Sequence, residues 1–250
     1  MVFSSYLFLF YFLPVALLLY YLSPARARHL TLTIVSYVFY GWANPLFLFL
    51  LLFTTAVDYA AGLVIARRDR RARAALIVSL GSNLLLLGFF KYYNFGAGTI
   101  DALAARLGLG DTGLDAALRV TLPLGISFYT FQSMSYTIDV YRGRTTAIRS
   151  FIDFACFVSM FPQLVAGPII RFTEVADQLR SRTHTITKFA RGVSFVAVGL
   201  AKKVLIANPC GKVADLAFDA GSLGLVDAWY GVTAYAFQIY FDFSGYSDMA

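Results

Sequence analysis

Long apolar runs joined by short polar links make up most of this chain. The first run, Val2–Leu22, holds no ionisable side chain, and at 1.5 Å rise per residue it reaches about 31 Å, enough to cross the hydrocarbon core of a bilayer. No basic residue precedes it and it is longer than the apolar part of a signal peptide, so we expect a retained span with a kink at Pro14. The pattern predicts further membrane segments over residues 30–42, 46–66, 74–90, 122–141, 193–207 and 228–250.

Three segments depart from this pattern. Residues 96–120 combine Ala, Leu and Gly with scattered charges, so we expect short amphipathic helices at the surface. Residues 209–227 are rich in Gly and Asp and are expected to form a loop before the last helix. Residues 150–172 have an arginine at each flank, which predicts a broken segment that returns to its own side of the membrane. The residues that interrupt this segment are Pro162, Gly167 and Pro168.

Composition supports a membrane protein. Hydrophobic residues make up 59% of the 250 and charged residues only 14%, whereas a soluble domain averages about 25% charged residues. The net charge of +7 does not indicate nucleic-acid binding, because the arginines lie in short links between apolar runs, as the positive-inside rule predicts for cytoplasmic loops. One alternating path places every basic link on the cytoplasmic side and the N-terminus outside. These links are residues 26–29, 67–73, 142–149 and 171–191.

Few residues suit metal or nucleophilic chemistry. Cys156 and Cys210 have no disulfide or metal-ligand spacing, and His29 and His184 lie in basic links, where we expect solvated loop side chains. The sequence has no Gly-rich phosphate loop and no nucleophile elbow. We therefore expect no metal site, and neither histidine is a catalytic candidate.

Two predicted helices carry polar side chains on one face. Positions i, i+3, i+7 and i+10 of a helix share a face, and an ionisable side chain at mid-membrane costs about 2.5 to 3.5 kcal/mol unless protein surrounds it. Hydrogen bonding between helices explains the first stripe most simply, because its Asp139 lies near a helix end. For Asp242 we favour the lining of a polar tunnel or the orientation of a catalytic group, while Asp248 points to a different face, near Ser244. The stripes are Tyr129, Gln132, Tyr136 and Asp139, then Tyr235, Gln238, Asp242 and Gly245.

Three cations allow two interpretations each. Lys202 and Lys203 lie in a predicted membrane segment and can extend to the interface, and Arg171 can anchor the cytoplasmic side. Alternatively, these cations bind the phosphate of an anionic donor. Taken alone, the residues describe a broken-helix membrane protein with intramembrane carboxylates, which fits a transporter and an intramembrane transferase equally well.

Three stretches in a fixed order carry a resemblance to a known family. They are LPLGISFYTFQSMSYTIDVYRG (residues 122–143), FVSMFPQLVAGPIIRF (157–172) and YFDFSGYSDMA (240–250). With FSSYLFLFYFLP and SYVFYGWANP near the start, they resemble the membrane-bound O-acyltransferase (MBOAT) family, within it the alginate O-acetylase (AlgI-like) branch, over nearly the whole chain.

The resemblance implies an all-α, polytopic protein of the bacterial inner membrane, with a tunnel through the bilayer. It implies O-acetyltransferase activity, in which an acetyl group from a cytoplasmic donor, expected to be acetyl-CoA, is passed to hydroxyls of an exopolysaccharide such as alginate. Implied partners are membrane lipid and periplasmic acetyl-transfer proteins, and no nucleic acid. The family's catalytic histidine lies in a W-H-I-S-L-S-type motif that no residue here matches. We therefore expect residues 1–250 to be one incomplete membrane-embedded domain, the N-terminal half, inactive alone, with the catalytic residue beyond Ala250.

Acyl transfer to a hydroxyl needs a base for the hydroxyl proton and a donor for the developing oxyanion. From this chain we expect Asp242, Gln132, Gln238 and Asp139 to line the tunnel or orient the base. Within the family, D-alanyl transfer to teichoic acid and cellulose acetylation are alternative activities, and a broken-helix secondary transporter is the alternative outside it. The residues expected to shape the broken segment near the donor entrance are Gln163, Pro168 and Arg171.

Overall fold

The computed structural model describes residues 4–42, 44–108, 113, 118–164, 167, 171–180 and 182–250. Within these ranges every regular element is helical, which confirms the predicted all-α class. In chain order the elements are η1 (Leu7–Phe12), α1 (Leu13–Leu22), α2 (Arg28–Gly41), α3 (Pro45–Ala66), α4 (Arg71–Arg106), α6 (Ile126–Tyr141), α7 (Phe151–Ser159), α8 (Phe161–Leu164), α9 (Phe172–Arg180), α10 (Ile186–Ala201), η2 (Lys202–Ala207), α11 (Asn208–Phe218) and α12 (Leu225–Met249), where η denotes a π-helix.

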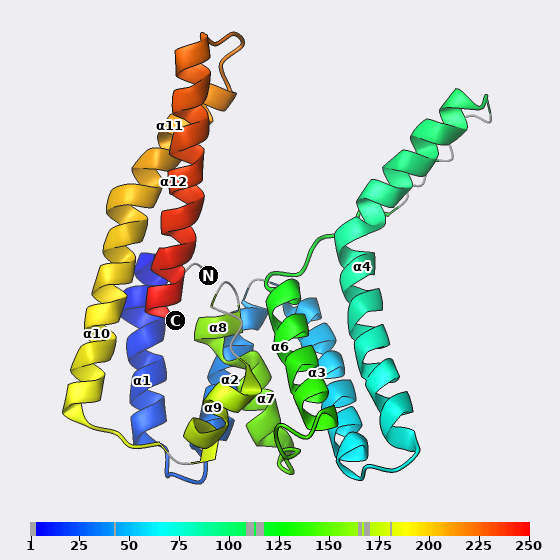
Figure 1. Cartoon of the computed structure of the whole chain (residues 1–250). Coiled ribbons are helices and arrows are strands. Elements are labelled where there is room, and N and C mark those ends of the chain that lie inside the picture. Colours follow the sequence, from blue (N-terminus) through cyan, green and yellow to red (C-terminus); the bar gives the residue numbers. More distant parts are fainter. Residues whose placement is uncertain are drawn as a thin grey trace.

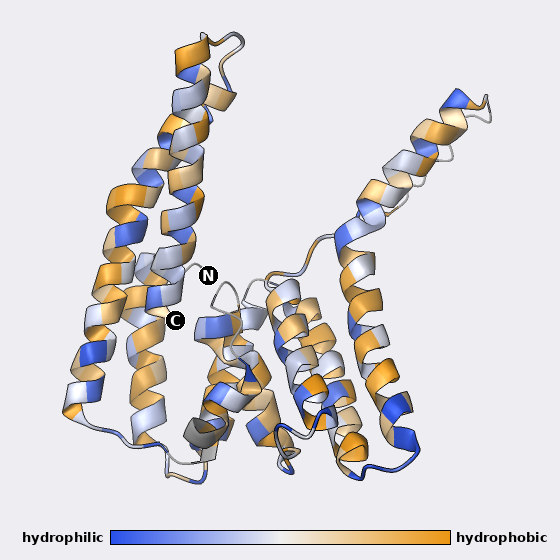
Figure 2. Cartoon of the chain, viewed as in Figure 1, coloured by the Kyte–Doolittle hydropathy of each residue, from blue (hydrophilic) through white to orange (hydrophobic). Residues whose placement is uncertain are grey.

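α3 and α4 are long and apolar enough to cross a membrane. Only 39% of the most apolar window of α3 and 11% of that of α4 is buried inside the protein, so most of these apolar side chains contact no protein core. Figure 2 shows hydrophobic residues along α3, α4 and α10, including their outer surfaces. Because lipid is the natural solvent for such surfaces, the structure fits a helical membrane protein.

Two clusters of buried side chains hold the helices together. The larger one joins α2, α3, α4, α6, α7 and α9, and its fully buried members include Leu51, Tyr129 and Phe154. The smaller one joins η1, α1, α2 and α8 through stacked and edge-on aromatic rings, among them Phe8 and Phe161. The last turns of α12 pack against this smaller core. In Figure 1, α12 lies beside the rod formed by α10, η2 and α11, and this hairpin extends beyond the rest of the molecule.

Each π-helix ends two residues before a proline. η1 precedes Pro14 and η2 precedes Pro209, and in both cases the residue before the proline donates its N–H to a carbonyl five residues back. Proline has no N–H and its ring collides with the carbonyl four residues earlier, so a widened turn lets the helix continue. At Pro14, where a kink was expected, the helix thus forms a π-helical turn before the proline. The loop predicted over residues 209–227 is wrong for residues 209–218, which form α11.

α4 is a single helix of 36 residues. The prediction that the span ends at residue 90 and that surface helices follow is therefore wrong up to Arg106, because this Ala- and Leu-rich segment favours helix despite its charges. Residues 109–112 and 114–117 of the predicted surface region lie outside the described residues. α6 begins at Ile126, four residues later than predicted, after Gly125 in the left-handed conformation at φ +73°.

The segment predicted to be broken is interrupted at Met160 and again at Gly167, one of the residues expected, which lies outside any helix. α7 ends where Met160 leaves helical geometry, and Pro162 lies in the first turn of α8. Pro168, which was expected to shape this segment, lies outside the described residues. Side chains from its two ends, Asp153 and Phe172, line the same cavity, so the two ends of the segment lie close together. The return to one side of the membrane stays a prediction.

Candidate functional site

The polar stripe of α6 is buried, as predicted. Tyr129, Gln132, Tyr136 and Asp139 are each 5% exposed or less. Gln132 Nε2 donates a hydrogen bond of 2.8 Å to the carbonyl oxygen of Phe157, which ties α6 to α7. The Tyr136 hydroxyl accepts the Ile148 N–H at 3.0 Å. The stripe therefore joins helices, which is the simpler of its two interpretations.

Asp139 occupies the end of α6 and has the character of an interfacial residue. Its carboxylate lies 3.7 Å from an Arg144 guanidinium nitrogen that is half exposed. Its carbonyl accepts the Arg144 N–H, while the Gly143 N–H bonds back to Val140. This is a Schellman helix end with Gly143 at φ +72°, where glycine is cheapest. The local chemistry accounts for Asp139 without a tunnel.

A buried carboxylate that was not among the predicted site residues lies at the centre of the α3–α4–α6 bundle. Asp58 is 0% exposed and accepts hydrogen bonds from Ser79 at 2.6 Å, from Asn83 at 2.8 and 2.9 Å, and from Ser133. Ser79 also lies 3.2 Å from Thr137 Oγ1. We call these five residues the Asp58 cluster. Each carboxylate oxygen has two donors, so three helices are joined by one acceptor.

The sequence contained a signal for the Asp58 cluster. Asp58 is an ionisable residue inside an otherwise apolar span, which in a membrane protein marks a partnered or functional group. The other cluster members form two pairs spaced i, i+4 on single helix faces, Ser79 with Asn83 and Ser133 with Thr137. The spacing identifies polar faces, whereas the meeting of three spans depends on tertiary packing.

The second stripe contacts the other half of its own hairpin. The Lys203 ammonium lies 2.5 Å from Asp242, and Lys202 contacts both Asp248 at 2.6 Å and Ser244 at 2.9 Å. Asp248 thus lies on a different face from Asp242, near Ser244, as predicted. Both lysines are held in ion pairs with α12, a contact that neither expectation for them included.

The two ion pairs flank a close approach of helix backbones. Gly199 of α10 and Gly245 of α12 are buried, and a Cβ added to either would come within 2.7 Å of the other's carbonyl oxygen. Small residues at such crossings let membrane helices approach closely. We call these two glycines, with Lys202, Lys203, Asp242 and Asp248, the α10–α12 clasp.

The rest of the second stripe lies along α11. Gln238 is half-buried against Gly211, and the Tyr235 ring packs edge-on against Phe218 although it is 45% exposed. The prediction that this face looks into protein holds for Gln238 and Asp242. Tyr235, which lies nearer the free end of the hairpin, is more exposed to solvent than that prediction implies.

The remaining predicted site residues lie apart from both polar groups. Gln163 is buried in α8, with its N–H bonded to the Met160 carbonyl. Arg171 is exposed just before α9. The structure therefore places the predicted site residues in separate regions: Gln132, Asp139 and Gln163 around α6 to α8, Gln238 and Asp242 in the hairpin, and Arg171 on the surface.

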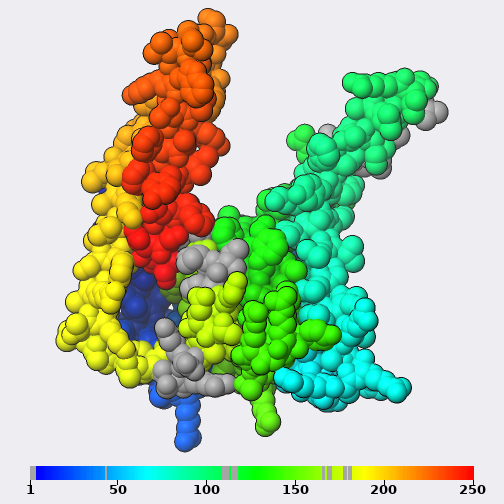
Figure 3. Space-filling view, in the orientation of Figure 1, coloured from blue at the N-terminus to red at the C-terminus, as the bar shows by residue number. Residues whose placement is uncertain are grey.

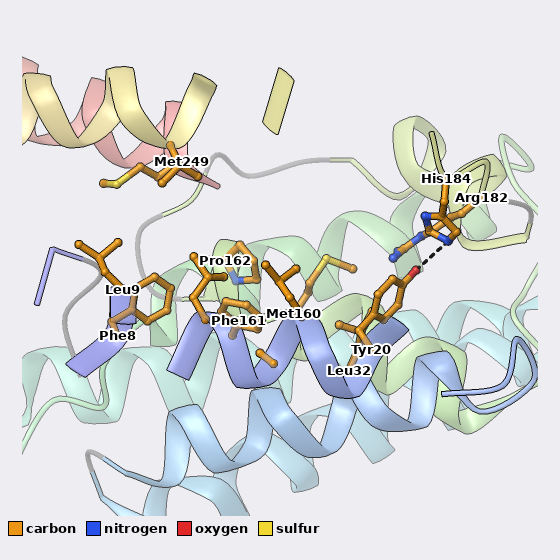
Figure 4. A pocket seen from close by; sticks show the side chains of 14 residues that line it. Phe8, Leu9, Tyr20, Leu32, Met160, Phe161, Pro162, Arg182, His184 and Met249 are labelled. Atoms are coloured by element: carbon orange, nitrogen blue, oxygen red, sulfur yellow. Dashed lines mark hydrogen bonds between the residues drawn. The ribbon is translucent and has the colours of Figure 1, made fainter. Parts of the chain in front are cut away.

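The prediction of solvated loop side chains is wrong for His29, which lies partly buried in α2, whereas His184 is exposed and outside any helix, as predicted. His29 Nδ1 lies 2.7 Å from Asp153 Oδ1, beside a cavity of about 670 Å³. His184 Nε2 lies 3.3 Å from the Tyr20 hydroxyl. This second pair closes the polar end of an otherwise apolar cavity of about 320 Å³ between α1, α8 and the end of α12 (Figure 4). Figure 3 shows the hollow with the N-terminal helix at its back.

In the described residues no group of three or more His, Cys, Asp and Glu side chains is placed to hold a metal ion. Cys156 is buried in α7 and Cys210 is partly buried in α11.

Comparison with known proteins shows similarity to one family. Residues 144–250 match the sequence model of the membrane-bound O-acyltransferases. The whole chain is 49% identical to the probable alginate O-acetylase of Pseudomonas aeruginosa, of which it covers 48%, and 48% identical to that of Azotobacter vinelandii, of which it covers 50%. It is 35% identical to the peptidoglycan O-acetyltransferase of Helicobacter pylori, of which it covers 53%.

The chain thus spans about half the length of the curated relatives that it matches. The similarity includes all of the chain in each of these three comparisons, and the family match contains the broken segment, the clasp and α12. Over residues 144–250 the chain is thus similar to the membrane-bound O-acyltransferases, and over its whole length it is similar to about half of each of these O-acetylating relatives.

Proposed function

We propose that the protein containing this chain is an O-acetyltransferase that acetylates hydroxyls of an exopolysaccharide such as alginate. The observation that carries the proposal is the 49% identity to an alginate O-acetylase over the whole chain. The family supports acyl transfer as the reaction class, and the apolar helices α3 and α4 support a membrane location.

The proposed donor is acetyl-CoA on the cytoplasmic face of the bacterial inner membrane, which the protein crosses several times. The arginine-rich links support this orientation by the positive-inside rule. The proposed partners are periplasmic proteins that pass the acetyl group on to the polymer. Formally, the acceptor oxygen forms a new ester bond, the thioester bond breaks, and the hydroxyl proton leaves to a base.

This chain is proposed to contribute positioning residues to that reaction. Gln132 fixes α7 against α6, and the Asp242–Lys203 pair fixes α12 against η2. Helices held in this way can keep reacting groups at the short separations that acyl transfer requires. Neither His29 nor His184 is proposed as the base, since their partners, Asp153 and Tyr20, lie outside both groups of positioning residues.

The similarity to a peptidoglycan O-acetyltransferase provides a second candidate acceptor. Deleting the gene in its own organism and measuring base-labile acetyl esters in both polymers separates the two. We expect exopolysaccharide acetylation to be lost and peptidoglycan acetylation to stay unchanged. Loss confined to peptidoglycan would replace the proposed acceptor, and unchanged acetylation of both polymers would contradict the proposal.

The Asp242→Asn variant of the full-length protein tests whether the clasp positions α12. Losing the carboxylate leaves the Lys203 ammonium without its counter-charge, and that cation is only 18% exposed. We expect polymer acetylation to fall about tenfold, which corresponds to roughly 1.4 kcal/mol of lost positioning. The double variant Asp242→Asn with Lys203→Gln should recover part of the activity.

The matched control is Asp219→Asn, which removes an exposed carboxylate beyond the end of α11 in the same hairpin. It should retain full acetylation. Wild-type acetylation by Asp242→Asn, at normal membrane abundance, would show that this carboxylate has no functional role.

A further inference from the structure

An arginine-lined cavity lies between the end of α3 and the segment that follows α6. It has a volume of about 420 Å³, and its lining includes Arg67, Arg68, Arg149, Val140 and Thr145 but no carboxylate. Both contributing segments lie at the end of the molecule that also carries α9 (Figure 1). Of the nearby acidic groups, Asp69 accepts the Arg71 N–H and Asp139 faces Arg144. The lining of the cavity itself therefore carries three guanidinium groups and no carboxylate.

The backbone conformation of Arg68 sets it apart from an ordinary surface arginine. It is the one non-glycine residue with positive φ among the described residues, at +54°. It follows the last turn of α3, a position where glycine is cheapest, and a side chain in this conformation costs about 1 kcal/mol or more. The chain thus retains an arginine at a position where glycine would stabilise the helix end.

The Arg68 guanidinium lies against a glycine beside the cavity. A Cβ at Gly143 would lie 2.4 Å from the Arg68 Nη2 atom. Gly143 is the left-handed residue of the Schellman end of α6, so two helix ends meet with the guanidinium lying across the glycine. The meeting holds Arg68 at the cavity, where its planar fork can donate two parallel hydrogen bonds to phosphate oxygens.

The arginine-lined cavity adjoins the larger cavity beside His29. Arg149, Ala147 and Thr146 line both, and the larger one adds apolar walls from Phe172 and Leu179. A ligand with phosphate at one end and a long, less polar arm would match the two cavities, with its phosphate in the arginine-lined cavity and its arm in the more apolar one.

We propose that Arg67, Arg68 and Arg149 form a binding site for the phosphate groups of such a ligand. Two sources share this chemistry: the coenzyme A portion of the acetyl donor and the headgroup of an anionic phospholipid. Assignment to the donor rests on the proposed function, whereas the phosphate site itself does not.

The test uses the full-length protein in nanodiscs of zwitterionic lipid, titrated with coenzyme A and, for comparison, with pantetheine, which has no phosphate. Coenzyme A should bind at least tenfold more tightly than pantetheine, and Arg68→Gln should remove about tenfold of that affinity, the loss expected for one charge-assisted contact. Gly143→Ala keeps every charge but displaces the guanidinium, and should weaken binding similarly. The matched control, Arg73→Gln, removes an exposed arginine in the first turn of α4, outside the cavity, and should bind normally.

A second arm measures the phosphatidylglycerol that copurifies with each variant, by native mass spectrometry. Loss of this lipid in Arg68→Gln and Gly143→Ala, with coenzyme A binding unchanged, would support the site with a lipid headgroup as its ligand. Unchanged retention of both ligands in both variants would overturn the proposal. Polymer acetylation is assayed separately, so that a real phosphate site in a protein without acetyltransferase activity can be recognised.

Arg68→Gly supplies a readout that misfolding cannot imitate. Glycine suits the left-handed backbone, so the melting temperature should rise while coenzyme A or lipid binding falls. Tighter or unchanged binding of both ligands by this variant would count against a role for Arg68.

Discussion

Replacing Gly199 with leucine should abolish the packing of α12 against α10, whereas the same replacement at Gly192 should leave it intact. At position 199 a Cβ would meet the Gly245 carbonyl oxygen at 2.4 Å and the Met249 side chain at 2.7 Å. A backbone atom cannot rotate away as a side chain can, so the helices must separate and the Lys–Asp pairs of the clasp must stretch. The free-energy loss should exceed the roughly 1–3 kcal/mol of ordinary overpacking.

Gly192 is the matched control because it lies in the same helix with no neighbouring atom within 4 Å of an added Cβ. Leucine there should be neutral or stabilising, since glycine is a poor helix former. The measurement is the fraction of full-length protein that stays monodisperse in detergent after heating. Equal loss for the two variants would mean that the clasp does not hold the hairpin.

Asp58→Ala is expected to be the most damaging single change in the α3–α4–α6 bundle. It removes the acceptor for Ser79, Asn83 and Ser133, all of which are buried and have no access to water. Each unsatisfied donor costs about 1–3 kcal/mol, so the total should be about 3 kcal/mol or more. The heat-stability assay described for Gly199 should show the loss.

A rescue variant distinguishes two explanations for a loss of stability in Asp58→Ala. Either the buried donors have lost their shared acceptor, or any substitution at position 58 is destabilising. Asp58→Leu combined with Ser79→Ala, Asn83→Leu and Ser133→Ala removes acceptor and donors together, and should recover much of the stability that Asp58→Ala loses. A combined variant less stable than Asp58→Ala would show that the carboxylate acts in some way other than as the shared acceptor.

The parts of the fold that could be predicted were those set by local pattern. Apolar length located α3 and α12 to within a few residues, and i, i+3, i+7 spacing identified the buried face of α6. These signals depend on residues close together in the sequence, so they are visible without tertiary structure.

The structure differs from the expectations where a residue's local pattern suggested one environment but contacts or turns elsewhere in the fold provide another. Pro209 was interpreted as the start of a loop, yet a π-helical turn accommodates it and α11 follows. Lys203 was expected at the interface or on a phosphate, but its partner Asp242 lies on another helix. The donors of Asp58 come from two other helices, so their convergence could not be derived from spacing along one of them.

The most direct test of the account measures acetyl transfer by the full-length protein in its own membrane. Membrane vesicles from wild-type and gene-deleted cells are incubated with acetyl-CoA labelled in the acetyl group, and label is counted in base-labile esters of the exopolysaccharide. We expect the polymer to be labelled in wild-type vesicles, to stay unlabelled in vesicles from gene-deleted cells, and to be labelled again when the gene is restored. Equal labelling of the polymer by wild-type and deleted vesicles would contradict the account.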